Sequence, residues 1–168
     1  MGKTAELLKI FDNIIENTNH DSLAIKDWLD CIGEKSISID WTAENLKIYG
    51  SNEIYLKQIE YANKDWKNQW VVIADCHADP IIIDDSDGYI KFARHGQGKW
   101  VFIKIANNLR LFAKFLKIYV TLFYIEFSEK ILDEDYEVRQ DFLNRIKIEI
   151  SSFLTDKEVQ NILFVLLG

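Results

Sequence analysis

The sequence predicts an α+β domain in which a central, mainly antiparallel sheet is flanked by helices, with an extended C-terminal helical segment. Apolar residues recur at helical spacing towards both ends of the chain, whereas the middle carries short alternating and β-branched runs. Strands and helices do not alternate along the chain, so a doubly wound parallel fold is disfavoured.

The length and composition predict a single domain. The chain has 168 residues, and 48% of them are hydrophobic, which is enough for one core without a disulfide or metal. The only proline is Pro80, and no linker rich in glycine, serine or proline divides the chain. We therefore expect one domain over residues 1–168, of which about 130–168 form a helical C-terminal extension.

The first part of the chain predicts two helices. Apolar spacing indicates a helix over residues about 4–17. Asp21 can cap a second helix that carries Leu23 and Trp28, and Gly33 fits the position after its end, where a left-handed backbone is needed.

Strands are expected next. Residues 37–41 alternate between apolar and polar, and residues 46–48 form another short apolar run. Residues 51–62 have helical spacing, with Ser51 as a candidate N-cap. The continuous apolar run Trp70–Ala74 predicts a buried central strand.

A hairpin follows the central strand. Residues 81–83 and 89–93 are β-branched and aromatic runs, and the Asp84–Gly88 loop between them ends in Asp-Gly. Its aspartates do not form an EF-hand calcium loop, because the required first and last ligand positions hold Ile83 and Arg94. We expect Trp100 to begin the last strand.

The remainder predicts helices only. A long helix is expected from about Ile105 to about Lys130, and a second one carries Val138 and later apolar residues at steps of four. Thr155 and Glu158 form a capping box for a terminal helix.

Charge and termini exclude several classes of protein. The chain holds 20 basic and 27 acidic residues, so binding of nucleic acid by the whole surface is unlikely on electrostatic grounds. The most apolar run, residues 112–127, contains Lys114 and Lys117 and is too short to span a bilayer. No signal peptide is visible, and Cys31 and Cys76 are expected to be free thiols, so we expect a cytoplasmic protein without membrane contact.

Catalytic and metal-binding patterns are weak. Cys76 and His77 are neighbours, but no second ligand pair accompanies them, and adjacent strand residues point to opposite faces. We expect no metal, no cofactor and no catalysis. The alternative is a small hydrolase in which Cys76 is the nucleophile and His77 or His95 is the base.

Basic charge is concentrated in one segment. Residues 91–117 contain seven basic residues and no acidic one, and the rest of the chain has a balance of −14. Arg110, Lys114 and Lys117 would share one helix face. This face is either simply solvated or part of a dipolar surface that orients a partner, and a nucleic-acid-binding regulator using residues 91–117 stays an alternative.

The middle of the sequence resembles the SUKH superfamily, which includes yeast cell-wall-synthesis regulators and many bacterial immunity proteins. The stretch from Gln69 to Trp100 follows its layout, although Ala78 stands where the family usually has glycine. The matching residues are Trp70, Asp79, Pro80, Asp84, His95, Gly96, Gly98 and Trp100, then Phe112, Phe115 and Leu116, with Gln58 and Tyr61 upstream.

The resemblance implies an α+β domain that binds protein without catalysis, and bacterial members are implied to bind and block a toxin domain, often a nuclease. The motif residues would be structural: Asp79, Pro80, Asp84, His95, Gly96, Gly98 and Trp100. The candidate partner-binding surface consists of Asp84, Asp85, Asp87, Arg94, Arg110, Lys114 and Lys117. The oligomeric state is left open.

Overall fold

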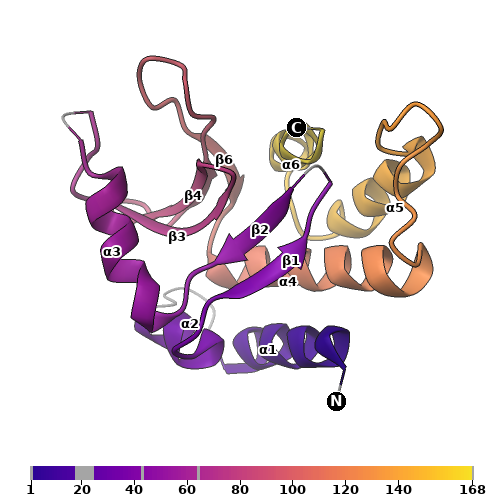
Figure 1. The fold of residues 1–168 in the computed structure, drawn as a ribbon, viewed down its shortest axis with the longest axis horizontal. Coiled ribbons are helices and arrows are strands. Elements are labelled where there is room, and N and C mark those ends of the chain that lie inside the picture. Colours follow the sequence, from indigo (N-terminus) through magenta and orange to yellow (C-terminus); the bar gives the residue numbers. More distant parts are fainter. Residues whose placement is uncertain (1, 18–24, 43, 64, 168) are drawn as a thin grey trace.

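The computed structural model describes residues 2–17, 25–42, 44–63 and 65–167 (Figure 1). The elements, in chain order, are α1 (Lys3–Asn17), α2 (Ile25–Ile32), β1 (Ile37–Asp40), β2 (Asn45–Ile48), α3 (Ser51–Tyr61), β3 (Trp70–Cys76), β4 (Asp79–Asp84), β5 (Ile90–Phe92), β6 (Ile103–Ala106), α4 (Leu109–Val120), the π-helix η1 (Thr121–Glu126), α5 (Gln140–Ile150) and α6 (Asp156–Leu166).

The six strands form one sheet in the order β1-β2-β3-β4-β5-β6, and every neighbouring pair is antiparallel. Each strand therefore pairs with the next one along the chain. Loops connect the strands, except between β2 and β3, where the connection contains helix α3. The predicted α+β class with a mainly antiparallel sheet is confirmed.

The main core lies between the sheet and the helices α1, α4, α5 and α6. Figure 1 shows α1 running beside α4, and these two helices pack against each other. Phe11 of α1, Ile73 of β3 and Phe112 of α4 are all fully or almost fully buried in this core. Phe142 and Ile162 bring α5 and α6 into the same cluster, so the C-terminal helices are part of the core and not an appendage.

The other face of the sheet carries α3 and a second, aromatic cluster. Tyr61, Trp66, Trp70, Trp100 and Phe102 make up this aromatic cluster, with neighbouring ring centroids 4.6–6.2 Å apart. Aromatic pairs at such distances add to the free energy of burial.

Gln58 fixes α3 to the sheet. Its side-chain amide donates to the Val72 carbonyl (2.9 Å) and its amide oxygen accepts from the Val72 N–H (3.0 Å). The β3–β4 register shifts between Val72 and Ala74. A bulge of this kind interrupts the regular ladder, and the glutamine satisfies both main-chain groups next to it.

Several predicted elements of the first half are confirmed, with one correction. The helix over about 4–17 and the hairpin around Asp84–Gly88 are present, and Gly33 has a φ of 93° after α2. Ser51 is not the N-cap of α3: Gly50 occupies that position and no side chain caps the helix. The proposed cap Asp21 lies outside the described residues.

The boundaries predicted after Trp100 were wrong. The last strand begins at Ile103 and continues to Ala106, because its residues pair with β5. The next helix therefore starts only at Leu109, where the Asn108 side chain accepts from the Leu111 N–H at 2.9 Å.

That helix also ends earlier than expected, because it turns into η1, which finishes at Glu126. Val138 precedes α5 and pairs with Leu132 in an isolated bridge. Among the helices of the described ranges, none has the length and apolar character needed to cross a bilayer.

The close packing of Gly50 against the backbone of residues 34 and 35 can be tested. A Cβ at this position would lie 2.5 Å from the Glu34 carbonyl oxygen and 2.5 Å from the Lys35 carbonyl carbon. We expect Gly50→Ala to lower the free energy of unfolding by about 1–3 kcal/mol, as measured by chemical denaturation, because backbone atoms must move to admit the methyl group.

Ser51→Ala is the matched control. Since Ser51 makes no cap bond, the substitution should change stability by less than about 0.5 kcal/mol. A loss of about 1 kcal/mol, typical of a deleted N-cap, would contradict the helix start described above.

Candidate functional site

The β3–β4 turn brings together the residues of the hydrolase alternative. His77 and Ala78 have φ values of 49° and 68°, as in a two-residue type I′ turn, which places Cys76 and Asp79 opposite each other. The His77 and His95 ring centroids lie 6.2 Å apart. A small cavity of about 160 Å³ borders four of these residues: Cys76, His77, Asp79 and His95.

The chemistry of this cluster does not favour a hydrolase. Burial, together with the carboxylates of Asp79 and Glu44, raises the pKa of the Cys76 thiol to about 11. A thiol with this pKa is neutral near pH 7 and is a poor nucleophile. Each imidazole instead meets a carboxylate: His77 Nδ1 lies 2.6 Å from Glu44 and His95 Nδ1 lies 2.6 Å from Asp79.

The described part of the chain contains no group of three or more histidine, cysteine or acidic side chains placed to hold a metal ion. The Cys76 thiol also makes no hydrogen bond to either imidazole within the described residues. The cluster therefore lacks the nucleophile–base contact that thiol catalysis needs.

Asp79 has a clear structural role. Its Oδ1 accepts from the His95 main-chain N–H at 2.8 Å, and its Oδ2 lies 3.5 Å from Arg94 Nη1. The loop that follows is able to turn because Gly96 and Gly98 have φ values of 77° and 76°. Trp100 then packs in the aromatic cluster.

Pro80 is the second residue of β4, opposite Asp75 of β3. Its carbonyl accepts from the Ala93 N–H at 3.2 Å. The neighbouring Tyr61, which the resemblance also included, donates its hydroxyl to Asp75 at 2.9 Å. These motif positions therefore connect strands, helix and loop.

Asp84 lies inside the hairpin and not on its surface, with only 4% of its area exposed. Burial alone would raise the pKa of Asp84, but bonds from Lys91 Nζ (2.8 Å) and from Ser86 lower it to about 2. Asp85 and Asp87 are exposed at the tip, and Asp87 also pairs with Lys91. Of the predicted partner surface, the hairpin thus contributes two accessible carboxylates.

The predicted basic residues of α4 are mostly engaged within the chain. Arg110 Nε donates to the Ile15 carbonyl at 3.1 Å, and Lys117 pairs with Asp12 at 2.5 Å. The Lys114 ammonium lies 4.7 Å from the Phe153 ring centroid.

Arg94 contacts α6. Its guanidinium donates to the Phe164 carbonyl at 3.1 Å and stacks on the Phe164 ring at 4.5 Å. It therefore ties the loop after β5 to α6.

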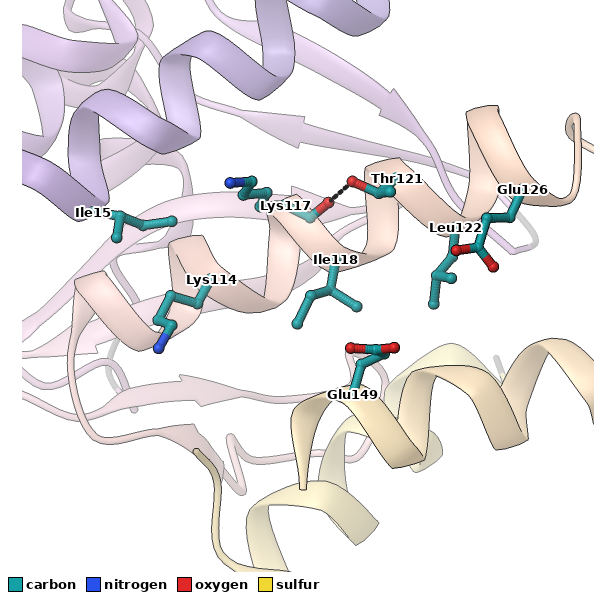
Figure 2. Close-up of a pocket in the computed structure, with 8 residues that line it drawn as sticks. All are labelled: Ile15, Lys114, Lys117, Ile118, Thr121, Leu122, Glu126 and Glu149. Atoms are coloured by element: carbon teal, nitrogen blue, oxygen red, sulfur yellow. Dashed lines mark hydrogen bonds between the residues drawn. The ribbon is translucent and has the colours of Figure 1, made fainter. Parts of the chain in front are cut away.

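A groove of about 380 Å³ lies beside the basic face of α4 (Figure 2). Ile118 and Leu122 point into it from α4 and η1, and Glu149 points towards them from α5. Lys114 and Lys117 lie towards one end, Glu126 lies at the other, and Glu149 faces Ile118 between them. Both glutamates are paired with Arg145, at 3.1 and 3.4 Å. The groove therefore offers no strong field of one sign.

A different surface was missed from the sequence. Residues 129–137, here called the acidic loop, connect η1 to α5 and carry five exposed carboxylates: Glu129, Asp133, Glu134, Asp135 and Glu137. Tyr136 stands among them with 85% of its area exposed and a φ of 61°. The run of acids around one tyrosine was visible in the sequence, but the segment was split between two expected helices.

Hydrogen bonds within the acidic loop fix its shape. The Asp133 carboxylate accepts from the main-chain N–H groups of Asp135 (2.9 Å) and Glu137 (3.0 Å). The Asp133 N–H donates to the Glu137 carbonyl at 2.8 Å. The carboxylates of the loop are thus presented on an ordered turn.

The turn at Ala78 gives a test. Because glycine adopts a positive φ without a steric cost, we expect Ala78→Gly to raise the free energy of unfolding by about 0.5–1 kcal/mol. Ala62→Gly is the control: Ala62 has an ordinary φ of −66°, so glycine there should lower stability by about 0.4–1 kcal/mol. Equal losses in the two variants would contradict the left-handed turn.

Thiol reactivity tests the cavity. In a Cys31→Ser background, we expect Cys76 to react slowly with iodoacetamide near pH 7, with a rate that rises about tenfold per pH unit up to its pKa of about 11. Fast, pH-independent alkylation at neutral pH would instead identify an activated thiolate and favour the hydrolase.

Comparison of the chain with protein-family models, with curated proteins and with solved structures finds no match. Function is therefore inferred from the residues of this chain, their geometry and the resemblance described above.

Proposed function

We propose that this chain is a non-catalytic, SUKH-type protein-binding domain that acts in the cytoplasm by binding and blocking a toxin domain with a basic surface. One observation carries the proposal: the basic residues of segment 91–117 are largely neutralised inside the chain, whereas many acidic residues stay exposed.

Four of the seven basic residues in this segment form ion pairs with carboxylates of the chain itself. They are Lys91, Arg94, Lys104 and Lys117, paired with Asp84 and Asp87, Asp79, Glu158 and Asp12, respectively. The acidic surplus, a formal charge of −7, is therefore carried by the outside of the molecule. Such a field attracts a positively charged partner and raises its association rate.

Nuclease domains bind phosphates and hence have basic clefts. An acidic protein that covers such a cleft inhibits by occlusion, which needs a complementary surface and no acid, base or nucleophile. The structural roles of the motif residues Asp79, Pro80 and Trp100 agree with a scaffold of this kind.

The alternatives have less support. The neutral Cys76 thiol disfavours hydrolysis. Binding of nucleic acid needs accessible cations, but within the described residues only Lys99 and Lys114 of the segment make neither an ion pair nor a hydrogen bond.

Co-expression tests the proposal. We expect the chain to restore colony formation in cells that express the toxin domain encoded beside its gene, and the purified pair to associate more slowly at about 0.5 M salt than at about 0.05 M. The absence of a toxin gene there, or no rescue together with no binding at low salt, would overturn the proposal.

A catalysis control separates the hydrolase. Cys76→Ser and His95→Asn should protect cells as well as the parent chain, because occlusion breaks no bond. Asparagine can still donate to Asp79 in place of the imidazole. Loss of protection in both soluble variants would count for the enzyme.

A further inference from the structure

A second groove, of about 610 Å³, opens beside the acidic loop. Side chains from four parts of the chain line it: the segment after β1, the acidic loop, α5 and α6. Six of them are Thr42, Leu132, Tyr136, Glu137, Leu143 and Leu166. The groove thus combines aliphatic walls with one lining carboxylate, Glu137, and the other exposed carboxylates belong to the same loop.

Thr42 is only 7% exposed, and it lines both this groove and the cavity at the β3–β4 turn. Its Oγ1 is closed off from solvent and finds no hydrogen-bond partner in the described part of the chain. Thr42 therefore contributes to the wall of the groove but offers no hydroxyl to a ligand there.

Tyr136 is the second unusual residue at the groove. Its φ of 61° is unfavourable for any side chain with a Cβ, yet its ring is almost fully exposed. The bonds made by Asp133 hold this conformation in place. The ring face next to several carboxylates is suited to a cation, which aromatic rings and acids both attract.

We infer that this groove binds a long cationic side chain, above all arginine, from a basic segment of the partner protein. This inference rests on the proposed function and assigns the binding surface. Arginine combines an aliphatic stem, which packs on the exposed Leu132 side chain, with a guanidinium that has five donors for the carboxylates of the acidic loop, Glu137 above all. Its planar group also stacks on aromatic rings such as Tyr136.

Hexa-arginine peptide is the probe, and ¹⁵N-labelled full chain is the receptor. We expect the largest amide shifts at Thr42, Tyr136 and Leu143, and a weaker response to hexa-lysine. The triple variant Glu134→Gln/Asp135→Asn/Glu137→Gln should raise the Kd about tenfold, because it removes three carboxylates that make no bonds within the loop through their side chains.

The matched control removes the same charge elsewhere. Glu6→Gln/Glu16→Gln/Glu34→Gln replaces exposed carboxylates on and near α1 and α2. It should change the Kd by less than about threefold, since screening weakens distant charges. Equal losses in the two triple variants, or shifts centred on α1, would overturn the inference in favour of unspecific attraction.

A single variant tests the groove itself. Tyr136→Gly relieves the backbone while removing the ring. It should weaken hexa-arginine binding without lowering the Tm. Unchanged affinity in this variant would overturn the inference.

The outcomes distinguish the two proposals. If the parent chain protects cells and the loop triple variant protects them equally, the groove is not the binding surface, but the proposed toxin-blocking function is kept. If the peptide occupies the groove but the parent chain protects no cell, the function is wrong and the cationic site stands.

Discussion

The Asp79 carboxylate connects three parts of the molecule that are distant in sequence. It holds the His95 loop by the main chain and the ring, and it lies beside Arg94. The Arg94 guanidinium in turn donates to the Phe164 carbonyl and stacks on the Phe164 ring in α6. The end of the central hairpin is therefore tied to the C-terminal helix, whose Leu166 forms a wall of the groove beside the acidic loop. One half-buried acid thus connects the motif region to α6, although neither Asp79 nor Arg94 lies in that groove.

The distribution of charge on the molecule depends on ion pairs within the chain. A buried or half-buried cation is stable only when a carboxylate or carbonyl lies close to it. Lys91 and Arg94 meet this condition inside the sheet region, and Lys117 meets it between two helices. Each internal pair neutralises one basic and at least one acidic side chain, so the basic segment does not form a positive patch and the net charge of −7 rests on the remaining acidic residues. The basic residues of segment 91–117 thus mostly stabilise the fold through contacts within the chain.

Sequence patterns predicted the fold class because the periods of the outer helices and of the Trp70–Phe92 strands are unambiguous. They failed at residues 103–106, a short stretch in which a strand cannot be told from the start of a helix, and at the π-helix Thr121–Glu126, which continues the apolar run of α4. The motif positions were identified, but their contacts, such as Gln58 with Val72, appear only in three dimensions. The acidic loop has no periodicity, and the groove beside it is formed by residues of four separate segments, among them α5 and α6. No local pattern contains that information.

Ala78 and Tyr136 both have a left-handed backbone conformation, which is unfavourable for residues other than glycine. Their surroundings differ. At Ala78 the side chain is a methyl group in a tight turn, and glycine would serve the turn better. At Tyr136 the same backbone conformation holds a large ring in solvent, where it adds nothing to the core. A chain optimised only for folding would carry glycine or asparagine there, because both adopt this conformation at lower cost. In the binding mode proposed above, the exposed ring of Tyr136, set on a loop with five carboxylates, is a contact for a cationic partner.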